Sequence, residues 1–114
     1  MGIGGSGMSS AAAIAKAYGF QVSGCDLKLT GHDVSHLKDV DILAVTPAVF
    51  FQSAQHPELK TAQLQGMAMT WQEFMGKYLH KDKFLICIAG THGKSTTTAM
   101  AGLLLQTAGL DPTV

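Results

Sequence analysis

The fold is decided by residues 84–98, which read FLICIAGTHGKSTTT. Residues 84–89 are apolar and predict a buried strand, and a glycine-containing loop separates them from a helix predicted over 94–107. A strand, a glycine loop and a helix that opens with Gly-Lys-Ser form the layout of a phosphate-binding P-loop. The sequence therefore predicts a nucleotide site at this loop.

Lys94 and Ser95 would carry the chemistry of this loop. Loop amides cradle the phosphates, the Lys94 ammonium offers a point charge to the terminal phosphates, and the Ser95 hydroxyl can bind Mg²⁺. The general P-loop pattern places a further glycine five positions before Gly93, where this chain has Ile88.

Another glycine loop lies at the N-terminus, where residues 2–7 read GIGGSG and fit the pattern G-x-G-x-x-G. Its glycines let a diphosphate approach the backbone amides, and the helix behind it directs free N–H groups at the anion. Asp26 lies 19 residues after Gly7, at the predicted end of a strand, where an acid commonly holds a ribose hydroxyl. The pattern predicts a phosphate ligand, and it leaves a nicotinamide-dependent oxidoreductase open.

The rest of the chain alternates between predicted strands and helices. Strands are expected over 20–25, 41–45, 67–69 and 84–89, and helices over 8–18, from 57 to 66, from 70 onward and over 94–107. Gly19 stands where a C-terminal helix cap belongs, and Thr70 with Glu73 has the spacing of a capping box. The alternation implies an α/β fold, a parallel sheet with helices on its faces, that binds ligands at the carboxyl ends of its strands.

Composition excludes several classes of protein. The chain has 114 residues, of which 46% are apolar and 14% charged, and its eight lysines balance eight acids. Disorder, nucleic-acid binding and attraction to an anionic membrane are therefore not expected. The two cysteines form no CxxC motif, which suits the reducing cytosol, and no apolar run approaches the ~20 residues of a membrane span.

Four histidines are weaker candidates. His32 and His36 lie four positions apart and would share one helical face, but no third ligand lies near them in the sequence. We therefore expect solvated or capping histidines rather than a metal site. His56 and His80 are expected at the surface.

Helically spaced aromatic residues and one thiol are expected in the core. Trp71, Phe74 and Tyr78 would pack inside rather than form a base-stacking platform. Cys87, within the apolar run, would be a small core residue.

Together these motifs resemble those of the Mur ligase family. The residues that carry the resemblance are 2–9, 23–26, 31–32, 46–48, 56–59 and 89–98, so it covers nearly the whole chain. The loop Gly-Thr-His-Gly-Lys-Ser-Thr-Thr-Thr is its most specific part, and the family's own variant of the P-loop accounts for Ile88.

The resemblance implies two domains. Residues 1–80 would form a Rossmann-like sheet with flanking helices that binds the UDP part of a substrate, and residues 81–114 would open a second α/β domain that binds MgATP. The implied UDP-binding residues are Gly4, Gly5, Ser6, Gly7, Met8, Asp26, His32, Thr46, Pro47 and Ala48. The implied ATP-binding residues are Gly90, Thr91, His92, Gly93, Lys94, Ser95 and Thr96, with Lys94 catalytic and Ser95 holding Mg²⁺ through ATP.

The implied activity of the intact enzyme is the ATP-dependent joining of L-alanine to UDP-N-acetylmuramate, in the cytoplasm, during peptidoglycan synthesis. The muramoyl carboxylate is phosphorylated, and the amine then displaces phosphate to form an amide. A recycling ligase that attaches a preformed peptide to the same UDP sugar and a non-catalytic nucleotide-binding module stay as alternatives. The expected partners are the two small substrates and the remaining domains of the same enzyme.

The chain departs from the family pattern at three places. Met1 alone stands for most of a first strand, only residues 27–40 separate two strands where the family carries a longer stretch, and Val114 closes the chain just past the P-loop helix. We therefore expect a fragment that does not catalyse ligation by itself, and residues missing between Asp26 and Gly31. A step between consecutive Cα atoms well above ~3.8 Å in that stretch would reveal such a gap.

Overall fold

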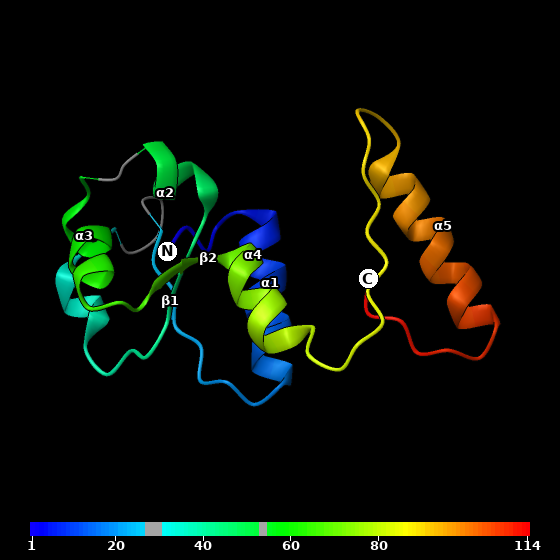
Figure 1. Cartoon of the computed structure of the whole chain (residues 1–114), viewed down its shortest axis with the longest axis horizontal. Coiled ribbons are helices and arrows are strands. Elements are labelled where there is room, and N and C mark those ends of the chain that lie inside the picture. The colour runs from blue at the N-terminus through cyan, green and yellow to red at the C-terminus, as the bar shows by residue number, and fades with distance from the viewer. Residues whose placement is uncertain (27–30, 53–54) are drawn as a thin grey trace. The chain divides into compact units, whose positions relative to one another are not determined.

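The computed structural model describes residues 1–26, 31–52 and 55–114 of the chain, which divides into two compact units (Figure 1). The first unit runs from Met1 to Lys83 and the second from Phe84 to Val114. Among the described residues, no helix combines the length and the apolar character needed to cross a membrane.

The first unit is built on a parallel sheet. β1 (Leu43–Val45) pairs in parallel with β2 (Ala68–Thr70), and the first residues of the two strands lie opposite one another. Both strands fall within or beside the predicted stretches 41–45 and 67–69. The parallel pairing that the alternation of strands and helices implied is confirmed.

Met1 extends this sheet along β1. Its amino group donates to the carbonyl of Ala44 at 2.8 Å, and its carbonyl accepts from the amide of Thr46 at 3.3 Å. The Gly2 amide in turn donates to the carbonyl of Cys25 at 2.9 Å. The start of the first glycine loop is therefore held between β1 and the segment that ends at Cys25.

Helices cover both faces of the sheet. In chain order the helical segments of this unit are α1 (Ser6–Ala17), η1 (Val34–Leu37), α2 (Pro47–Gln52), α3 (Pro57–Leu64), α4 (Trp71–Phe74) and the π-helical η2 (Met75–Leu79). Side chains of β1 alternate between the two faces, since Val45 belongs to the core with Leu59 of α3, whereas Ala44 packs with Phe74 of α4. Figure 1 shows α3 and α1 on opposite sides of the strands.

Two local sequence signals act as predicted. Gly19, with φ of 89°, ends α1, and its amide donates to the carbonyl of Lys16 at 3.1 Å. At the start of α4 the Thr70 hydroxyl accepts from the Glu73 amide at 3.3 Å, and a Glu73 carboxylate oxygen accepts from the Thr70 amide at 2.8 Å. Both helix ends therefore satisfy their own backbone groups.

The strand predicted over 20–25 is wrong, because no ladder is assigned there. At the end of this extended segment, the Cys25 carbonyl accepts hydrogen bonds from the amides of Gly2 and Ile3 in the first glycine loop. Phe20 instead packs edge-to-face on Phe74, with ring centroids 5.5 Å apart. The suspected gap between Asp26 and Gly31 falls on residues 27–30, which lie outside the described residues, so the Cα spacing does not test it.

The second unit consists of an extended segment and one helix within residues 84–114. α5 (Lys94–Thr107) has the predicted bounds. The strand predicted over 84–89 is wrong, since no partner strand pairs with these residues in the described part of the unit, and a strand needs such a ladder. Cys87 is accordingly exposed rather than buried in a core.

Candidate functional site

A cavity of about 400 Å³ opens beside the first glycine loop. It lies where the loop, the start of α1 and the carboxyl ends of β1 and β2 meet, which is the usual ligand position on a parallel sheet. The lining residues are Gly2, Gly5, Ser6, Gly7, Met8, Asp26, His32, Thr46, Val49 and Trp71. The structure thus brings together most of the residues that the sequence proposed for a UDP site, from three separate parts of the chain.

The N-terminus of α1 supplies hydrogen-bond donors to this cavity. Gly5 is the N-cap in an extended conformation and provides no side-chain acceptor for the first-turn amides. α4 differs, because the Thr70 side chain caps it. An uncapped helix N-terminus concentrates free N–H groups and the positive end of the helix dipole, which suits an anion.

Asp26 fixes the shape of the loop. Its Oδ2 accepts a hydrogen bond from the Gly4 amide at 3.0 Å, and a Cβ added to Gly4 would lie 3.0 Å from the same oxygen. A side chain at position 4 would therefore displace this carboxylate. Sequence reasoning placed Asp26 in the site as a ribose ligand, and it missed this contact within the loop.

Trp71 belongs to the cavity, although its helical spacing predicted a core position. The residue is half-buried, and a Cβ added to Gly7 would lie 3.1 Å from its indole Cζ2. Phe74 is buried as predicted, whereas Tyr78 is 41% exposed and stacks on it with ring centroids 5.3 Å apart. The position of Trp71 directly after β2 was the available signal, since ligands bind at strand ends.

Thr46, directly after β1, and Val49, within α2, contribute to the lining. Thr46 Oγ1 accepts from the Ala48 amide at 3.3 Å, which shapes the turn into α2. Pro47 and Ala48, also proposed for the site, form the first residues of α2 and lie outside the lining.

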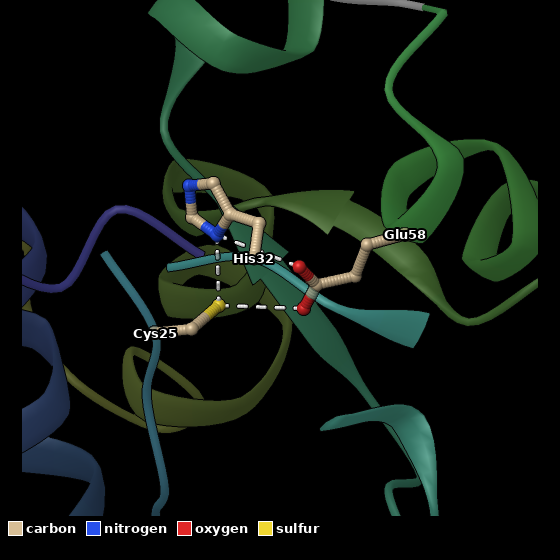
Figure 2. A group of neighbouring side chains, drawn as sticks. All are labelled: Cys25, His32 and Glu58. Atoms are coloured by element: carbon tan, nitrogen blue, oxygen red, sulfur yellow. Dashed lines mark hydrogen bonds and ion pairs between the residues drawn. The ribbon is translucent and has the colours of Figure 1, made fainter. Parts of the chain in front are cut away.

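A buried cluster adjoins the cavity and is formed by Cys25, His32 and Glu58 (Figure 2). The Cys25 thiol donates to Glu58 Oε1 at 3.3 Å, and His32 Nδ1 lies 3.2 Å from Cys25 Sγ and 3.4 Å from Glu58 Oε2. Burial, followed by the hydrogen bond to Glu58, raises the pKa of the Cys25 thiol to about 11. Burial also lowers the pKa of His32, so the imidazole is favoured in its neutral form.

The histidine predictions are partly wrong. His36 is a capping residue as expected, because its Nδ1 accepts from the Asp33 amide at 3.4 Å at the start of η1. His32 is not solvated, since its side chain is 4% exposed. His56 is only half-exposed, and its Nδ1 is buried without a hydrogen-bond partner in the described part of the chain.

The second glycine loop is exposed at the start of α5. Gly93 is the N-cap with φ of 76°, a left-handed conformation that favours glycine. Lys94 Nζ folds back over the loop and donates to the carbonyls of Gly90 at 2.7 Å and Thr91 at 3.4 Å. The geometry thus places the ammonium group beside the backbone that a phosphate would contact.

Comparison with known proteins gives one family. The family model described as "Mur ligase family, catalytic domain" matches residues 1–83. Curated proteins named UDP-N-acetylmuramate–L-alanine ligase match over the whole chain, with identities of 37% for Desulforapulum autotrophicum, 38% for Pelobacter propionicus and 35% for Clostridium perfringens. No solved structure matches the chain.

The chain spans only 27–28% of the length of these relatives. The alignments run over 129 or 130 positions although this chain has 114 residues, so the relatives carry residues that it lacks. The difference in length agrees with the shortening expected from the family pattern.

Proposed function

The chain belongs to the Mur ligase family, and from this premise we propose that it is part of an ATP-dependent ligase that joins L-alanine to UDP-N-acetylmuramate in peptidoglycan synthesis. The names of its relatives favour L-alanine over the preformed peptide of a recycling ligase. Cys25 and Cys87 are both free thiols, which suits a cytoplasmic enzyme.

The observation that carries this proposal is the cavity at the N-terminus of α1. A diphosphate would lie on the loop of Gly4, Gly5, Ser6 and Gly7, where no side chain caps the helix. Its donors would be the amides of Ser6 and Gly7, because the Gly4 amide donates to Asp26 and the Gly5 amide to the Gly2 carbonyl. Asp26 would hold the loop in place, and the half-buried Trp71 offers an apolar ring beside the phosphates. We assign residues 1–80 to binding the UDP part of the substrate.

We assign residues 81–114 to the start of the ATP-binding domain. The residues present suit a nucleoside triphosphate with Mg²⁺, because the loop is exposed, Gly93 opens a helix of 14 residues and the Lys94 ammonium already lies over the loop. Gly90, Thr91, His92, Gly93, Lys94, Ser95 and Thr96 would hold the phosphates, with the Ser95 hydroxyl on the metal ion. When bound, MgATP supplies the phosphoryl group that activates the carboxylate.

The contribution of this chain to the reaction is positioning and charge. The first loop would orient the UDP sugar through its diphosphate, and Lys94 would neutralise charge on the phosphoryl group in transit. The amine then attacks the activated carboxyl carbon and phosphate leaves, so an amide forms. We expect no ligation by the 114 residues alone, since they span little more than a quarter of the relatives.

Isothermal titration of the chain tests this assignment. UDP-N-acetylmuramate should bind with one site per chain, UDP should compete with it, and NAD should bind more weakly than either. Tighter binding of NAD than of UDP-N-acetylmuramate would favour an oxidoreductase instead. Binding of UDP-N-acetylmuramate with no L-alanine-dependent phosphate release by the full-length enzyme would favour a non-catalytic module.

A further inference from the structure

Three residues with metal-binding side chains meet beside the cavity although they are far apart in the sequence. Cys25 ends the extended segment after α1, His32 precedes η1, and Glu58 lies in the first turn of α3 (Figure 2). Their side chains point toward one another, and one ligand atom from each lies within 4.8 Å of the others. The fold, rather than a local motif, therefore assembles this group.

The burial of Glu58 points to a missing positive charge. The residue is 0% exposed, and its Oε2 has no hydrogen-bond partner within residues 1–26, 31–52 and 55–114. Burying a carboxylate is costly unless it is paired and hydrogen-bonded. The adjacent groups are the Cys25 thiol, which donates to Oε1 at 3.3 Å, and the His32 imidazole, whose Nδ1 lies 3.4 Å from Oε2.

The nearby cationic candidates compensate Glu58 poorly. His36 Nδ1 lies 3.8 Å from Oε1, beyond hydrogen-bonding distance, and accepts a hydrogen bond from the Asp33 amide at 3.4 Å. The Met1 ammonium donates to the Ala44 carbonyl at 2.8 Å. A bound divalent cation would satisfy the carboxylate directly.

The distances suit tetrahedral zinc. With Zn–S near ~2.3 Å and Zn–N and Zn–O near ~2.0 Å, ligand atoms on a tetrahedral ion stand roughly 3.3–3.6 Å apart. The observed separations are near this range, at 3.2 Å from Cys25 Sγ to His32 Nδ1, 3.3 Å from Cys25 Sγ to Glu58 Oε1 and 3.4 Å from His32 Nδ1 to Glu58 Oε2. Glu58 therefore faces the other two ligands with different oxygens of its carboxylate, and one ligand atom from each residue lies within 4.8 Å of the others. A thiolate with an imidazole and one carboxylate also selects zinc-like ions over Mg²⁺ and Ca²⁺, which prefer oxygen ligands alone.

We propose that Cys25 Sγ, His32 Nδ1 and a carboxylate oxygen of Glu58 form a zinc site with three protein ligands and a fourth position open to water. Binding displaces the thiol proton to solvent, so the net reaction exchanges one proton for the metal ion. Because His32 also lines the cavity, the metal holds this imidazole in one orientation at the cavity wall. The site itself is independent of which nucleotide the cavity takes.

The test begins with the whole 114-residue chain, kept reduced with a phosphine and freed of metal by a chelator. Zinc is titrated against a chromogenic chelator, and Co²⁺ is then used as a spectroscopic substitute. We expect one zinc per chain, a rise in melting temperature that EDTA reverses, and a thiolate-to-cobalt charge-transfer band with the visible bands of tetrahedral Co²⁺.

Matched thiol variants assign the ligand. Cys87→Ser leaves Cys25 as the only thiol and should retain the charge-transfer band and the zinc affinity, because Cys87 is exposed and belongs to the other unit. Cys25→Ser should lose the band and at least a hundredfold in zinc affinity. His32→Asn should weaken zinc at least tenfold, whereas His80→Asn serves as the control histidine and should not.

Several results would overturn the proposal. One is the absence of zinc uptake by the wild-type chain whose far-ultraviolet circular dichroism shows it folded, since the three side chains would then be a hydrogen-bonded network only. Another is loss of the band in Cys87→Ser. If Cys25→Ser does not fold, the band in wild type and in Cys87→Ser still decides the question, because both keep the complete cluster.

Discussion

The carboxylate of Asp26 accepts a hydrogen bond from the Gly4 amide at 3.0 Å and so ties the end of one extended segment to the first glycine loop. If this contact shapes the loop, Asp26→Ala should weaken binding of UDP-N-acetylmuramate by about 1 kcal/mol or more, roughly fivefold in Kd. Asp26→Asn should bind closer to wild type, because its amide oxygen can accept from Gly4. Calorimetry measures both.

Asp41→Ala is the matched control, since Asp41 is exposed and lies away from the cavity lining. It should leave the Kd unchanged. Equal weakening by Asp26→Ala and Asp26→Asn would instead show that the negative charge itself, for example on a ribose hydroxyl, is what matters.

The contact between Gly7 and Trp71 predicts an effect on binding without a loss of stability. A methyl group at Gly7 would lie 3.1 Å from the indole and push it toward the cavity, while alanine favours the helix by up to about 1 kcal/mol over glycine. Gly7→Ala should therefore bind the UDP sugar several-fold more weakly at unchanged or higher melting temperature. Gly76→Ala, where nothing lies within 4 Å of an added Cβ, should not alter binding.

The features predicted correctly from the sequence depend on interactions between neighbouring residues. The end of α1 at Gly19, the capping box of Thr70 with Glu73 and the bounds of α5 each depend on residues a few positions apart. The position of the glycine loop was also predictable, because its glycines and the helix that follows them lie within residues 2–17.

The features that the sequence did not predict depend on contacts between segments that are far apart in the chain. Cys25 and Glu58 are 33 positions apart, so the buried cluster around His32 could not be predicted from the sequence alone. Residues 84–89 have a strand-like sequence, but a strand forms only where a partner supplies the ladder, and none is paired with it in the described residues.

The capping box predicts that the first unit loses stability as the pH falls. The amide and hydroxyl of Thr70 donate to the Glu73 carboxylate and lower its pKa from 4.5. A pKa depressed in the folded state stabilises the fold above the unfolded value, and this stabilisation is lost as the pH falls through the folded value. Below about pH 4.5, the urea midpoint of Glu73→Gln should therefore fall less steeply with decreasing pH than that of wild type.

Hydrogen bonds to Ser35 also lower the pKa of Asp33. Its contribution to the loss of stability in acid is the same in wild type and in Glu73→Gln. The difference between the two curves therefore isolates Glu73. Superimposable pH dependence of Glu73→Gln and wild type would show that the capping carboxylate is not coupled to folding.

The two thiols should differ sharply in reactivity. Burial and the hydrogen bond to Glu58 raise the pKa of Cys25 to about 11, which alone lowers its thiolate population at pH 8 about a hundredfold below that of an ordinary thiol. Iodoacetamide in the presence of EDTA should therefore modify the exposed Cys87 first, as peptide mass spectrometry would show. Urea should remove the difference, and equal rates in the folded chain would contradict the buried thiol.

The raised pKa of Cys25 also predicts a loss of stability at alkaline pH. A thiol whose pKa is raised in the folded state stabilises the fold fully below its unfolded value near 9, and this contribution is lost as the pH rises through about 11. Cys25→Ser should show a smaller alkaline loss of stability than wild type, and Cys87→Ser should match wild type.

Lys94 is the residue whose removal should stop the chemistry without disturbing the fold. Its ammonium donates to the carbonyls of Gly90 and Thr91 on an exposed loop, so Lys94→Ala should leave the melting temperature within a few degrees of wild type. In the full-length enzyme, loss of this charge on the transferring phosphoryl group should lower kcat by about a thousandfold or more. Lys81→Ala, an exposed lysine outside the loop, is the control. A Lys94→Ala enzyme that keeps more than a tenth of wild-type turnover would remove Lys94 from the catalytic assignment.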